Sequence, residues 1–416
     1  MNFYRHRLDG INLDKLRVLA LRHGWLVETP DVTRAGFGAI AKSQVVEGGI
    51  NAHLADVNIL ANAVVVGDNA PSGVGPLAFT AVPFDREGPV RLWVPEHVIF
   101  MSWTVGIWLT STNEDPGVAL ALVDAVDLVD LDDNYVVSEI THDPSPDSYA
   151  HLVAAAVEEI RHSDLQKVVL ARESRGRTTR KIDPAVVGLR LTNREPACTL
   201  FAVPGLNDSR FVGASPEMLL SAIDGSVACH PLAGTVVLSE ADDAIDYPKW
   251  LLGSSKNLFE HRVVVDEIVE QLKTRCHEVR ADDRPSVVIL RSVAHLGTWI
   301  YAKIDDPSLH ALELLALLHP TPAVGGLPQQ QALETISRLE TNNRGLYAGA
   351  VGWCDGDANG EWWIGIRGIS VRDDVFSAWA GAGIVADSDP LSEREETRSK
   401  MSTILIGLGD NSIAER

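Results

Sequence analysis

The sequence is short of positive charge. Its 36 Lys and Arg residues are outnumbered by 57 Asp and Glu residues, which leaves a formal net charge of −21. Such an acidic chain repels nucleic acid and anionic membrane surfaces, so we expect neither as a partner. An anionic ligand would need a local source of positive charge in this field, and a divalent metal held by carboxylates would supply it.

Cysteine is also scarce. The four cysteines are scattered, with no Cys-x-x-Cys pair and no histidine at zinc-finger spacing; they are Cys198, Cys229, Cys276 and Cys354. This pattern argues against a disulfide framework and against a zinc site. It predicts buried thiols in a reducing compartment.

Long apolar runs are missing too. The N-terminal residues MNFYRHRLDGINLDKL lack the apolar core of a signal peptide, and apolar stretches such as GVALALVDAVDLVDL are interrupted by Asp. Because a membrane-spanning helix needs about 20 apolar residues, we expect no membrane segment and a cytoplasmic protein.

Short apolar or alternating segments between Gly, Pro and Asp are abundant instead. Within residues 1–143 they predict strands such as FGAIAKS, PLAFTAVPFDREGP and VRLWVPEHVIFMSW. One long strand is predicted over 286–304, with a break at Gly297 as an alternative, and GLYAGAVGWCDGD and GEWWIGIRGISVRDD predict two long strands of a hairpin. Helical periodicity predicts helices over 143–164, around 183–193, from about Asp243 to His277, over 308–320 and 328–340, and from Leu391 onward.

The predicted strands dominate, and many neighbours are spaced as hairpins. We therefore expect an α+β fold with a large, mostly antiparallel β-sheet core and flanking helices. No repeat or low-complexity linker divides the chain, so we predict one unit over 1–416, with a strand-rich portion at 1–143 and a catalytic portion at 144–408. No helix has the pattern of an exposed dimer surface, and we expect a monomer.

The last predicted helix carries a notable charge pattern. Glu393, Glu396 and Lys400 lie at positions i, i+3 and i+7, so they project from one helix face, next to a Gly-rich turn that includes Gly381. Two carboxylates and an ammonium at this place could bind a cation and an anion. A solvated helix face with an ordinary Glu–Lys pair fits the same pattern.

Lys167 and Glu217 are candidates for proton transfer. Lys167 begins the apolar strand QKVVLAR, where loss of solvent would favour a neutral amine that acts as a base. Glu217 follows the turn GASP and precedes apolar residues, and a carboxyl in such surroundings can stay protonated and act as an acid. A surface lysine and a glutamate at a strand edge are the alternatives.

Three further candidates lie on charged or Gly-containing segments. In CHPLAGT, the backbone N–H groups of Gly234 and Thr235 could meet an anionic oxygen, unless the segment is a plain turn. Glu260 could be a third carboxylate for a metal, or a charge that complements a helix N-terminus.

The remaining candidates lie on apolar strands and in one loop. Arg367, in WWIGIRG, would need an anion from the protein or from a ligand if it is buried. His295, in SVAHLGTW, also fits an ordinary core histidine. The loop HPTPAVGG (319–326), which contains Ala323, can bring backbone close to a ligand. A base, an acid, several carboxylates and several cations together favour one site for an anionic substrate.

Ten of these segments, in this order, carry a family resemblance: KVVLAR, FVGASPEMLL, HPLAGT, FEHRVVVDEI, VAHLGT, LHPTPAVGG, AGAVGW, IGIRG, WAGAGIV and Glu-Thr-x-x-Lys at 396–400. From about residue 145 to 408 the chain resembles the chorismate-utilising enzymes, which include isochorismate synthase, salicylate synthase, anthranilate synthase component I and aminodeoxychorismate synthase. The resemblance implies the fold of anthranilate synthase component I.

Two positions favour particular members of this family. Aminodeoxychorismate synthases carry a nucleophilic lysine in the motif that reads PLAGT here, with Ala233 in its place, and anthranilate synthases lack the lysine found here at 167. The resemblance then leaves isochorismate synthase, favoured by HPTPAVGG and GWCD, and salicylate synthase as the alternative. A catalytically silent, metal-binding relative is a further alternative, and the destination of the product, in menaquinone, siderophore or salicylate synthesis, stays open.

The resemblance also implies roles for the candidate residues. Glu260 and Glu396 would hold Mg²⁺, with Glu393 direct or through water, and the metal would bind the ring carboxylate of chorismate. Lys167 would activate the water that attacks C2, and Glu217 would protonate the departing C4 hydroxyl. Further contacts with chorismate are expected from Gly234, Thr235, His295, Ala323, Arg367, Gly381 and Lys400.

Two residues depart from the family pattern. Arg394 stands where a tryptophan is usual, and Asn257 stands where some relatives carry an acid. The second change would thin the outer coordination of the metal.

Overall fold

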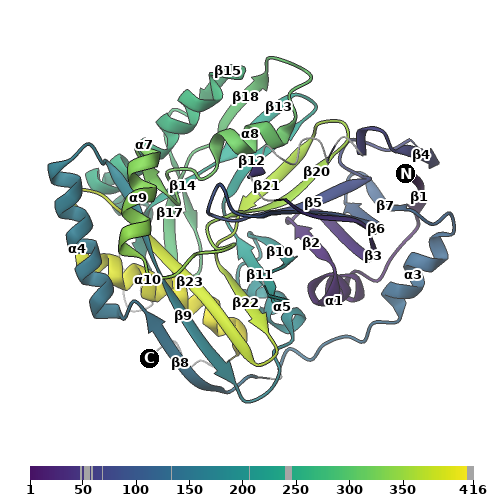
Figure 1. Cartoon of the computed structure of the whole chain (residues 1–416), viewed down its shortest axis with the longest axis horizontal. Coiled ribbons are helices and arrows are strands. Elements are labelled where there is room, and N and C mark those ends of the chain that lie inside the picture. The colour runs from purple at the N-terminus through teal and green to yellow at the C-terminus, as the bar shows by residue number, and fades with distance from the viewer. Residues whose placement is uncertain are drawn as a thin grey trace.

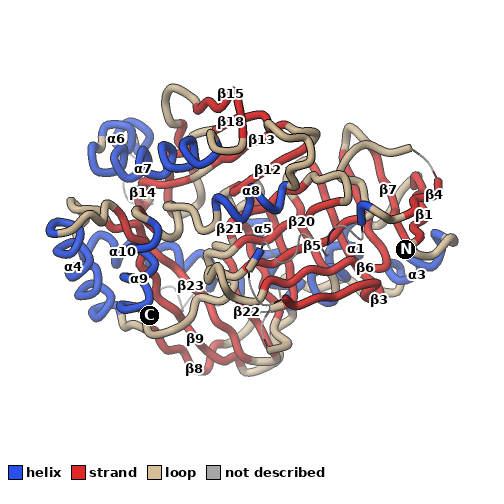
Figure 2. The backbone as a smooth tube through the Cα atoms, turned by 45° about the horizontal axis from the view of Figure 1, so that its top comes forward, coloured by secondary structure: helices blue, strands red, loops and turns tan. Residues whose placement is uncertain are grey.

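The computed structural model describes residues 1–46, 49, 50, 57, 60–67, 69–132, 134–205, 207–238 and 246–409. Within this part of the chain, one large twisted sheet extends through both the N-terminal and the C-terminal portions, and a small second sheet lies beside it. Helices pack around the strands, with α4 and α10 at one end and α3 at the other (Figures 1 and 2).

The described helices are α1 (Leu13–His23), α3 (Pro116–Asp124), α4 (Pro146–His162), α5 (Pro184–Arg194), α6 (Tyr247–Gly253), α7 (Ser255–Leu272), α8 (Ala311–Leu318), α9 (Gln329–Leu339) and α10 (Pro390–Leu405), followed by the 3-10 turn η2 (Ile406–Leu408).

The described strands are β1 (Asn2–Leu8), β2 (Trp25–Glu28), β3 (Val32–Val46), β4 (Val64–Gly67), β5 (Leu77–Val82), β6 (Val90–Ser102), β7 (Gly106–Ser111), β8 (Val137–Asp143), β9 (Lys167–Thr178), β10 (Thr199–Pro204), β11 (Arg210–Ser215), β12 (Met218–Ile223), β13 (Ser226–His230), β14 (Leu232–Val237), β15 (Cys276–Ala281), β16 (Ser286–Ile289), β17 (Val293–Gly297), β18 (Ile300–Ile304), β19 (Gly326–Leu327), β20 (Ala350–Asp355), β21 (Gly360–Ile364), β22 (Gly368–Arg372) and β23 (Val375–Ile384).

The large sheet has two arms. One runs β8–β9–β23–β22–β11–β10–β2–β3, and the other runs β5–β20–β21–β12–β13–β18–β15. Strand β6 pairs with β3 of the first arm and with β5 of the second, and so joins them. The described pairings are antiparallel except β1 with β4, which agrees with the predicted α+β class.

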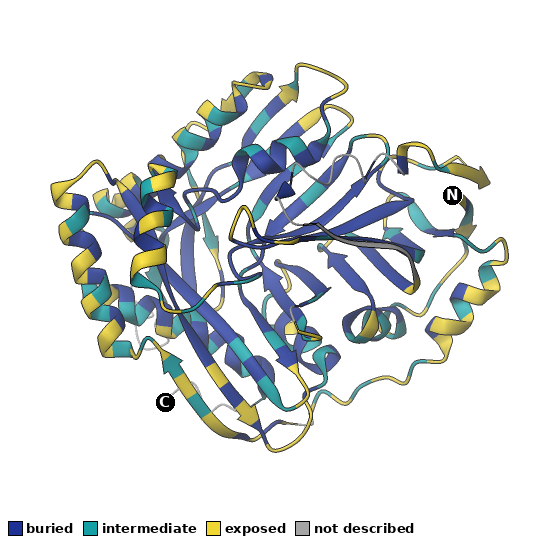
Figure 3. Ribbon diagram, viewed as in Figure 1, coloured by how far each residue is buried: buried dark blue, intermediate teal, exposed yellow. Residues whose placement is uncertain are grey.

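Apolar side chains fill the space between the arms. Trp25, Phe79, Phe201, Trp353 and Trp363 belong to one buried cluster. The central strands are therefore buried over most of their length, whereas the edge strands β4 and β8 and the outer faces of α3 and α4 are largely exposed (Figure 3). All four cysteines are buried and free, as predicted. None of the described helices combines the length and apolar character needed to cross a membrane.

The predicted long helix from Asp243 to His277 is wrong as a single element. Its start at Asp243 lies outside the described residues, and the helical part is divided at Ser254 into α6 and α7. The division has a local cause, since the Ser254 hydroxyl accepts a hydrogen bond from the backbone N–H of Asn257 and caps a new helix. Helix α7 ends at Leu272, and His277 already belongs to β15.

The predicted strand over 286–304 is also divided. It forms β16, β17 and β18, of which β16 and β17 pair in the small sheet while β18 joins the large one. The break at Gly297 that we considered is present, and a second break falls after Ile289. The fold of the first 143 residues also includes α1 and α3, which the strand-rich reading missed although Asn12 and Asp115 cap them.

The hairpin over DANG is present as β20 and β21. The strand predicted beyond it is broken between Ile364 and Gly368, where Arg367 has a φ of 53°. A positive φ turns the chain away from extended geometry. This break sets the direction in which Arg367 leaves the sheet.

Candidate active site

A cavity of about 70 Å³ lies where the first arm of the sheet meets the small sheet and helices α7 and α10. Nine of the twelve predicted site residues line it: Glu217, Thr235, Glu260, His295, Ala323, Arg367, Gly381, Glu396 and Lys400. Lys167, Gly234 and Glu393 are not part of the lining, but Lys167 pairs with Glu260, Gly234 precedes Thr235, and Glu393 lies one helical turn before Glu396. The nine lining residues come from eight separate segments of the sequence.

Lys167 lies at the start of β9 and its side chain is fully buried, so the alternative of a surface lysine is wrong. Its Nζ atom is 3.2 Å from Oε1 of Glu260, and this ion pair packs against β23 at Gly383. Burial by itself would raise the pKa of the Glu260 carboxyl. The nearby charges of Lys167 and Lys256 outweigh burial and hold that pKa below its ordinary value.

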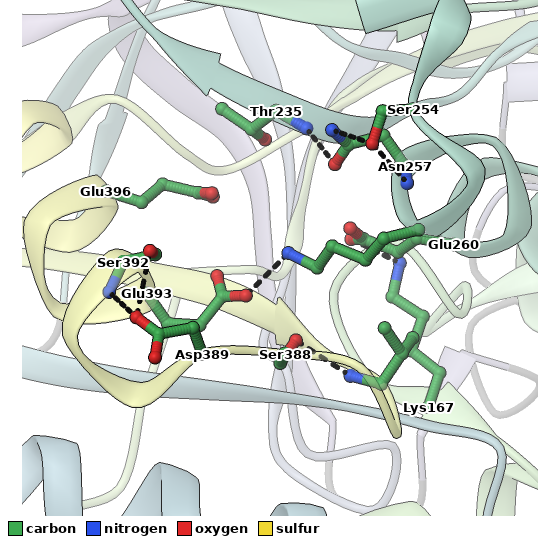
Figure 4. Close-up of polar contacts among 12 residues, drawn as sticks. Lys167, Thr235, Ser254, Asn257, Glu260, Ser388, Asp389, Ser392, Glu393 and Glu396 are labelled. Atoms are coloured by element: carbon green, nitrogen blue, oxygen red, sulfur yellow. Dashed lines mark hydrogen bonds and ion pairs between the residues drawn. The ribbon is translucent and has the colours of Figure 1, made fainter.

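Three glutamates form what we term the carboxylate cluster: Glu260 of α7 and Glu393 and Glu396 of α10. All three are buried, so α10 does not present a solvated face here. Figure 4 shows the three carboxylates facing a common space between the two helices. Each also meets one lysine: Lys167 at 3.2 Å, Lys256 at 2.6 Å and Lys400 at 2.6 Å, respectively.

The cluster has the donor chemistry of a magnesium site, since Mg²⁺ prefers carboxylate oxygens. Burial, together with the charge of Glu396, raises the pKa of the Glu393 carboxyl, which shows that the negative charges crowd one another. A cation would relieve this crowding. As the side chains stand, however, no group of three or more His, Cys, Asp or Glu residues in the described part of the chain is arranged to hold a metal ion.

Glu217 lies in the turn between β11 and β12 and is buried. The turn is held by Ser215, whose hydroxyl donates to the carbonyl of Ile364 at 2.7 Å. Burial raises the pKa of the Glu217 carboxyl to about 7, against a weaker opposing effect of the backbone N–H of Leu232. A carboxyl with this pKa is half protonated near neutral pH and can serve as a proton donor.

Arg367, His295 and Thr235 form a hydrogen-bonded row along one wall. Thr235 and His295 are paired residues of β14 and β17, and the Thr235 hydroxyl lies 3.0 Å from Nδ1 of His295. The Arg367 guanidinium lies 3.3 Å from Nε2 on the other side of the ring. Because a guanidinium only donates, Nε2 is the acceptor and Nδ1 carries the hydrogen.

This row of three side chains sets the charge on one wall of the cavity. Burial, Lys400 and Arg367 hold the pKa of His295 well below its ordinary value, so the ring is neutral. Arg367 is buried and has no ion-pair partner within the described residues. Its charge is therefore available to an anion in the cavity.

The predicted anion contact of the Thr235 backbone differs in the structure. The Thr235 N–H lies 3.3 Å from Oδ1 of Asn257, which accepts from it, so it is not directed at a ligand. Gly234 has a φ of 74°, and a Cβ there would be 2.7 Å from the carbonyl oxygen of Asn257. Asn257 thus ties β14 to the first turn of α7. Its Nδ2 also donates to the Ser254 hydroxyl at 3.0 Å, a donor role that an ionised acid at 257 could not fill.

The loop around Ala323 is held in place by hydrogen bonds to two of its backbone carbonyls. Arg344, paired with Glu340, donates to the carbonyl of Val324 at 2.9 Å, and the N–H of Val169 donates to the carbonyl of Gly325 at 2.8 Å. These bonds fix the loop against β9.

Several lining residues were not singled out from the sequence. Tyr347 and Trp379 both line the cavity and stack with ring centroids 5.6 Å apart. They lie in or beside the segments AGAVGW and WAGAGIV, so the segments were recognised but not these side chains. Lys256, which lies outside the lining, was also missed. It lies one helical turn before Glu260, a spacing that places the two on one face.

Comparisons with known proteins identify the family of this chain. The profile described as "Chorismate binding enzyme" matches residues 121–409. The vibriobactin-specific isochorismate synthase of Vibrio cholerae is 34% identical over 336 residues, covering 80% of this chain and 80% of that protein. Isochorismate synthase EntC of Escherichia coli (strain K12) is 32% identical over 350 residues, covering 83% of this chain and 85% of that protein.

The solved structure of MenF, the menaquinone-specific isochorismate synthase from Escherichia coli, superposes with a TM-score of 0.81 at 22% identity, over 98% of this chain and 94% of that one. This likeness concerns the fold. The chain belongs to the chorismate binding enzyme family, and the predictions of family, fold and an enzymatic role are confirmed.

Proposed function

We propose that the protein is an isochorismate synthase, an isomerase that converts chorismate reversibly to isochorismate with Mg²⁺ as cofactor. The names of the relatives support this assignment. The observation that carries it is the buried Glu217 carboxyl, with a pKa raised to about 7, on a cavity that Arg367 and Lys400 also line. A dicarboxylate such as chorismate would meet two cations and one proton donor there.

The protein's own groups would divide the chemistry as follows. Glu217 gives its proton to the C4 oxygen, which leaves as water. Lys167 takes a proton from the water that adds at C2, and the ring double bonds shift between the two carbons. One water enters and one leaves, so the atoms balance. The rate enhancement would come from holding both proton-transfer groups next to the bound ring.

Lys167 needs a change of partner before it can act as a base. Its Nζ atom pairs with the Glu260 carboxylate at 3.2 Å. Only the neutral amine accepts a proton, so Lys167 would have to leave Glu260 and give up one proton to solvent before it takes one from the attacking water. When bound by the carboxylate cluster, Mg²⁺ would supply positive charge to a carboxylate of the substrate.

Ala233 supports water as the nucleophile. It lines the cavity on β14, at the position where the family resemblance places the nucleophilic lysine of aminodeoxychorismate synthases. A methyl group at this place offers no amine to the ring.

Product analysis tests the proposal. The purified protein is incubated with chorismate and Mg²⁺, and with chorismate, Mg²⁺ and excess EDTA, and the products are separated by chromatography. We expect isochorismate in the first mixture and none in the second. Salicylate with pyruvate would instead favour a salicylate synthase, and a folded protein that leaves chorismate unchanged would contradict both. A cytoplasmic location and a monomeric state stay predictions, the latter checked by light scattering.

A further inference from the structure

Lys256 has no role in the proposed reaction and does not line the cavity. It lies in the first turn of α7, and its Nζ atom is 2.6 Å from Oε1 of Glu393. The dashed line that reaches the Glu393 carboxylate in Figure 4 marks this contact. The Glu393 side chain is 2% exposed, whereas that of Lys256 is 25% exposed.

Each glutamate of the carboxylate cluster contacts one lysine. Lys167 and Lys400 have further work in the proposed reaction, as base and as a contact for the substrate. Lys256 does not line the cavity, and its one described polar contact is Glu393. Its place in the structure is therefore explained by the charge of that glutamate.

Without a cation, Glu393 would be a buried carboxylate beside Glu396. Such a group either takes up a proton or costs several kcal/mol of lost solvation. An ammonium at 2.6 Å offsets this cost in the metal-free protein. A divalent cation that binds Glu393 would take over this task, and two cations at one carboxylate repel each other.

We propose that Lys256 is the resident counter-cation of the carboxylate cluster: it neutralises Glu393 in the metal-free enzyme and leaves it when the divalent cation binds. The inference rests on the metal site of the proposed function. Lys256 can withdraw because its long side chain is partly exposed at a helix start, so its ammonium can reach water without a change of the backbone. It thereby lowers the affinity for the metal.

The test compares four variants with the wild type by titration calorimetry with MgCl₂, without chorismate, and by melting temperature in EDTA and in saturating Mg²⁺. Lys256→Met and Lys256→Gln remove the charge, and Lys256→Arg keeps it. Lys273→Met is the matched control, because Lys273 is the C-cap of the same helix but pairs with the exposed Glu270 at 2.7 Å.

For Lys256→Met and Lys256→Gln we expect a Mg²⁺ Kd lower by roughly tenfold, about 1.4 kcal/mol. In EDTA they should melt below the wild type, and Mg²⁺ should raise their melting temperature by more. Lys256→Arg and Lys273→Met should match the wild type. A Lys256→Met protein that folds only with Mg²⁺ also supports the inference, and Lys256→Gln, which keeps a hydrogen-bond donor, then supplies the Kd.

An unchanged or weaker Kd in both uncharged variants would overturn the inference, since it would mean that Lys256 stays in place and orients Glu393. A wild type that binds no Mg²⁺ would instead overturn the metal site of the proposed function. Neither readout requires turnover, so failure of the proposed reaction is seen separately.

Discussion

Gly383 and Glu260 lie so close that a side chain at position 383 would overlap the Glu260 carboxylate. A Cβ there would be 2.1 Å from Oε1 of Glu260 and 2.9 Å from Cε of Lys167. The bare backbone of β23 is thus the surface against which the Lys167–Glu260 pair packs. The glycine is required by this close approach and by no unusual dihedral angle.

For Gly383→Ala we expect the ion pair to be displaced, because the added methyl group would overlap the Glu260 carboxylate oxygen and press on the Lys167 side chain. Overpacking of this kind costs about 1–3 kcal/mol of stability, and displacement of both groups should lower turnover of chorismate by tenfold or more, as roughly expected for misplaced catalytic groups. Urea unfolding and product assays measure the two effects. Gly253→Ala is the control, since a Cβ there meets nothing within 4 Å. Wild-type turnover by Gly383→Ala would contradict the argument.

Lys167→Met tests the base. Methionine has a similar length and suits the buried strand, and Glu260 keeps the field of Lys256, so we expect a folded protein. Loss of a general base should lower kcat by roughly a hundred- to ten-thousand-fold. Lys181→Met removes an exposed lysine that pairs with Asp373 and should leave kcat unchanged. If the two variants turned over alike, Lys167 would not be the base.

The sequence was most informative where one element carries the whole pattern. The spacing of Glu393, Glu396 and Lys400 on a single helix is enough to place them on one face, and α10 has that face buried. The ordered motifs identify the family because each is a short contiguous segment that can be recognised without knowing its contacts. Both kinds of signal are local in the chain.

Contacts between distant segments could not be predicted in this way. The pairing of Lys256 with Glu393 joins residues 137 positions apart, and nothing in either segment specifies it. The division of α6 from α7 depends on the hydrogen bond that the Ser254 hydroxyl accepts from the Asn257 N–H. Apolar periodicity alone does not predict such a cap. Arg367 owes its direction to a strand break that its apolar neighbours conceal.

His295→Phe tests whether the histidine positions Arg367. Phenylalanine fills the space but removes the acceptor at Nε2, so the Arg367 guanidinium loses its described polar contact in the wall. We expect KM for chorismate to rise by roughly tenfold, the effect of about 1.4 kcal/mol in binding, with a smaller change in kcat. His295→Gln keeps a carbonyl acceptor and should recover part of the affinity. A fall in kcat at unchanged KM in both variants would assign His295 to the chemical step instead.

Glu217 makes both activity and stability depend on pH in a calculable direction. Its pKa rises from 4.5 in the unfolded chain to about 7 in the folded protein. Between these values the folded state binds the extra proton, so the contribution of Glu217 to stability is full below pH 4.5, declines as pH rises and is lost above about 7. The acid form needed for turnover is lost over the upper part of the same range.

Glu217→Gln should therefore do two things at once. It should lower kcat by roughly a hundred- to ten-thousand-fold, because glutamine cannot donate the proton. It should also flatten the decline in unfolding free energy between pH 4.5 and about 7, measured by urea titrations at several pH values. Glu361→Gln, a change at a glutamate that pairs with Arg34 away from the cavity, should leave the kcat profile as it is. A Glu217→Gln enzyme with full activity, or with an unaltered pH slope of stability, would mean that the raised pKa belongs to another group.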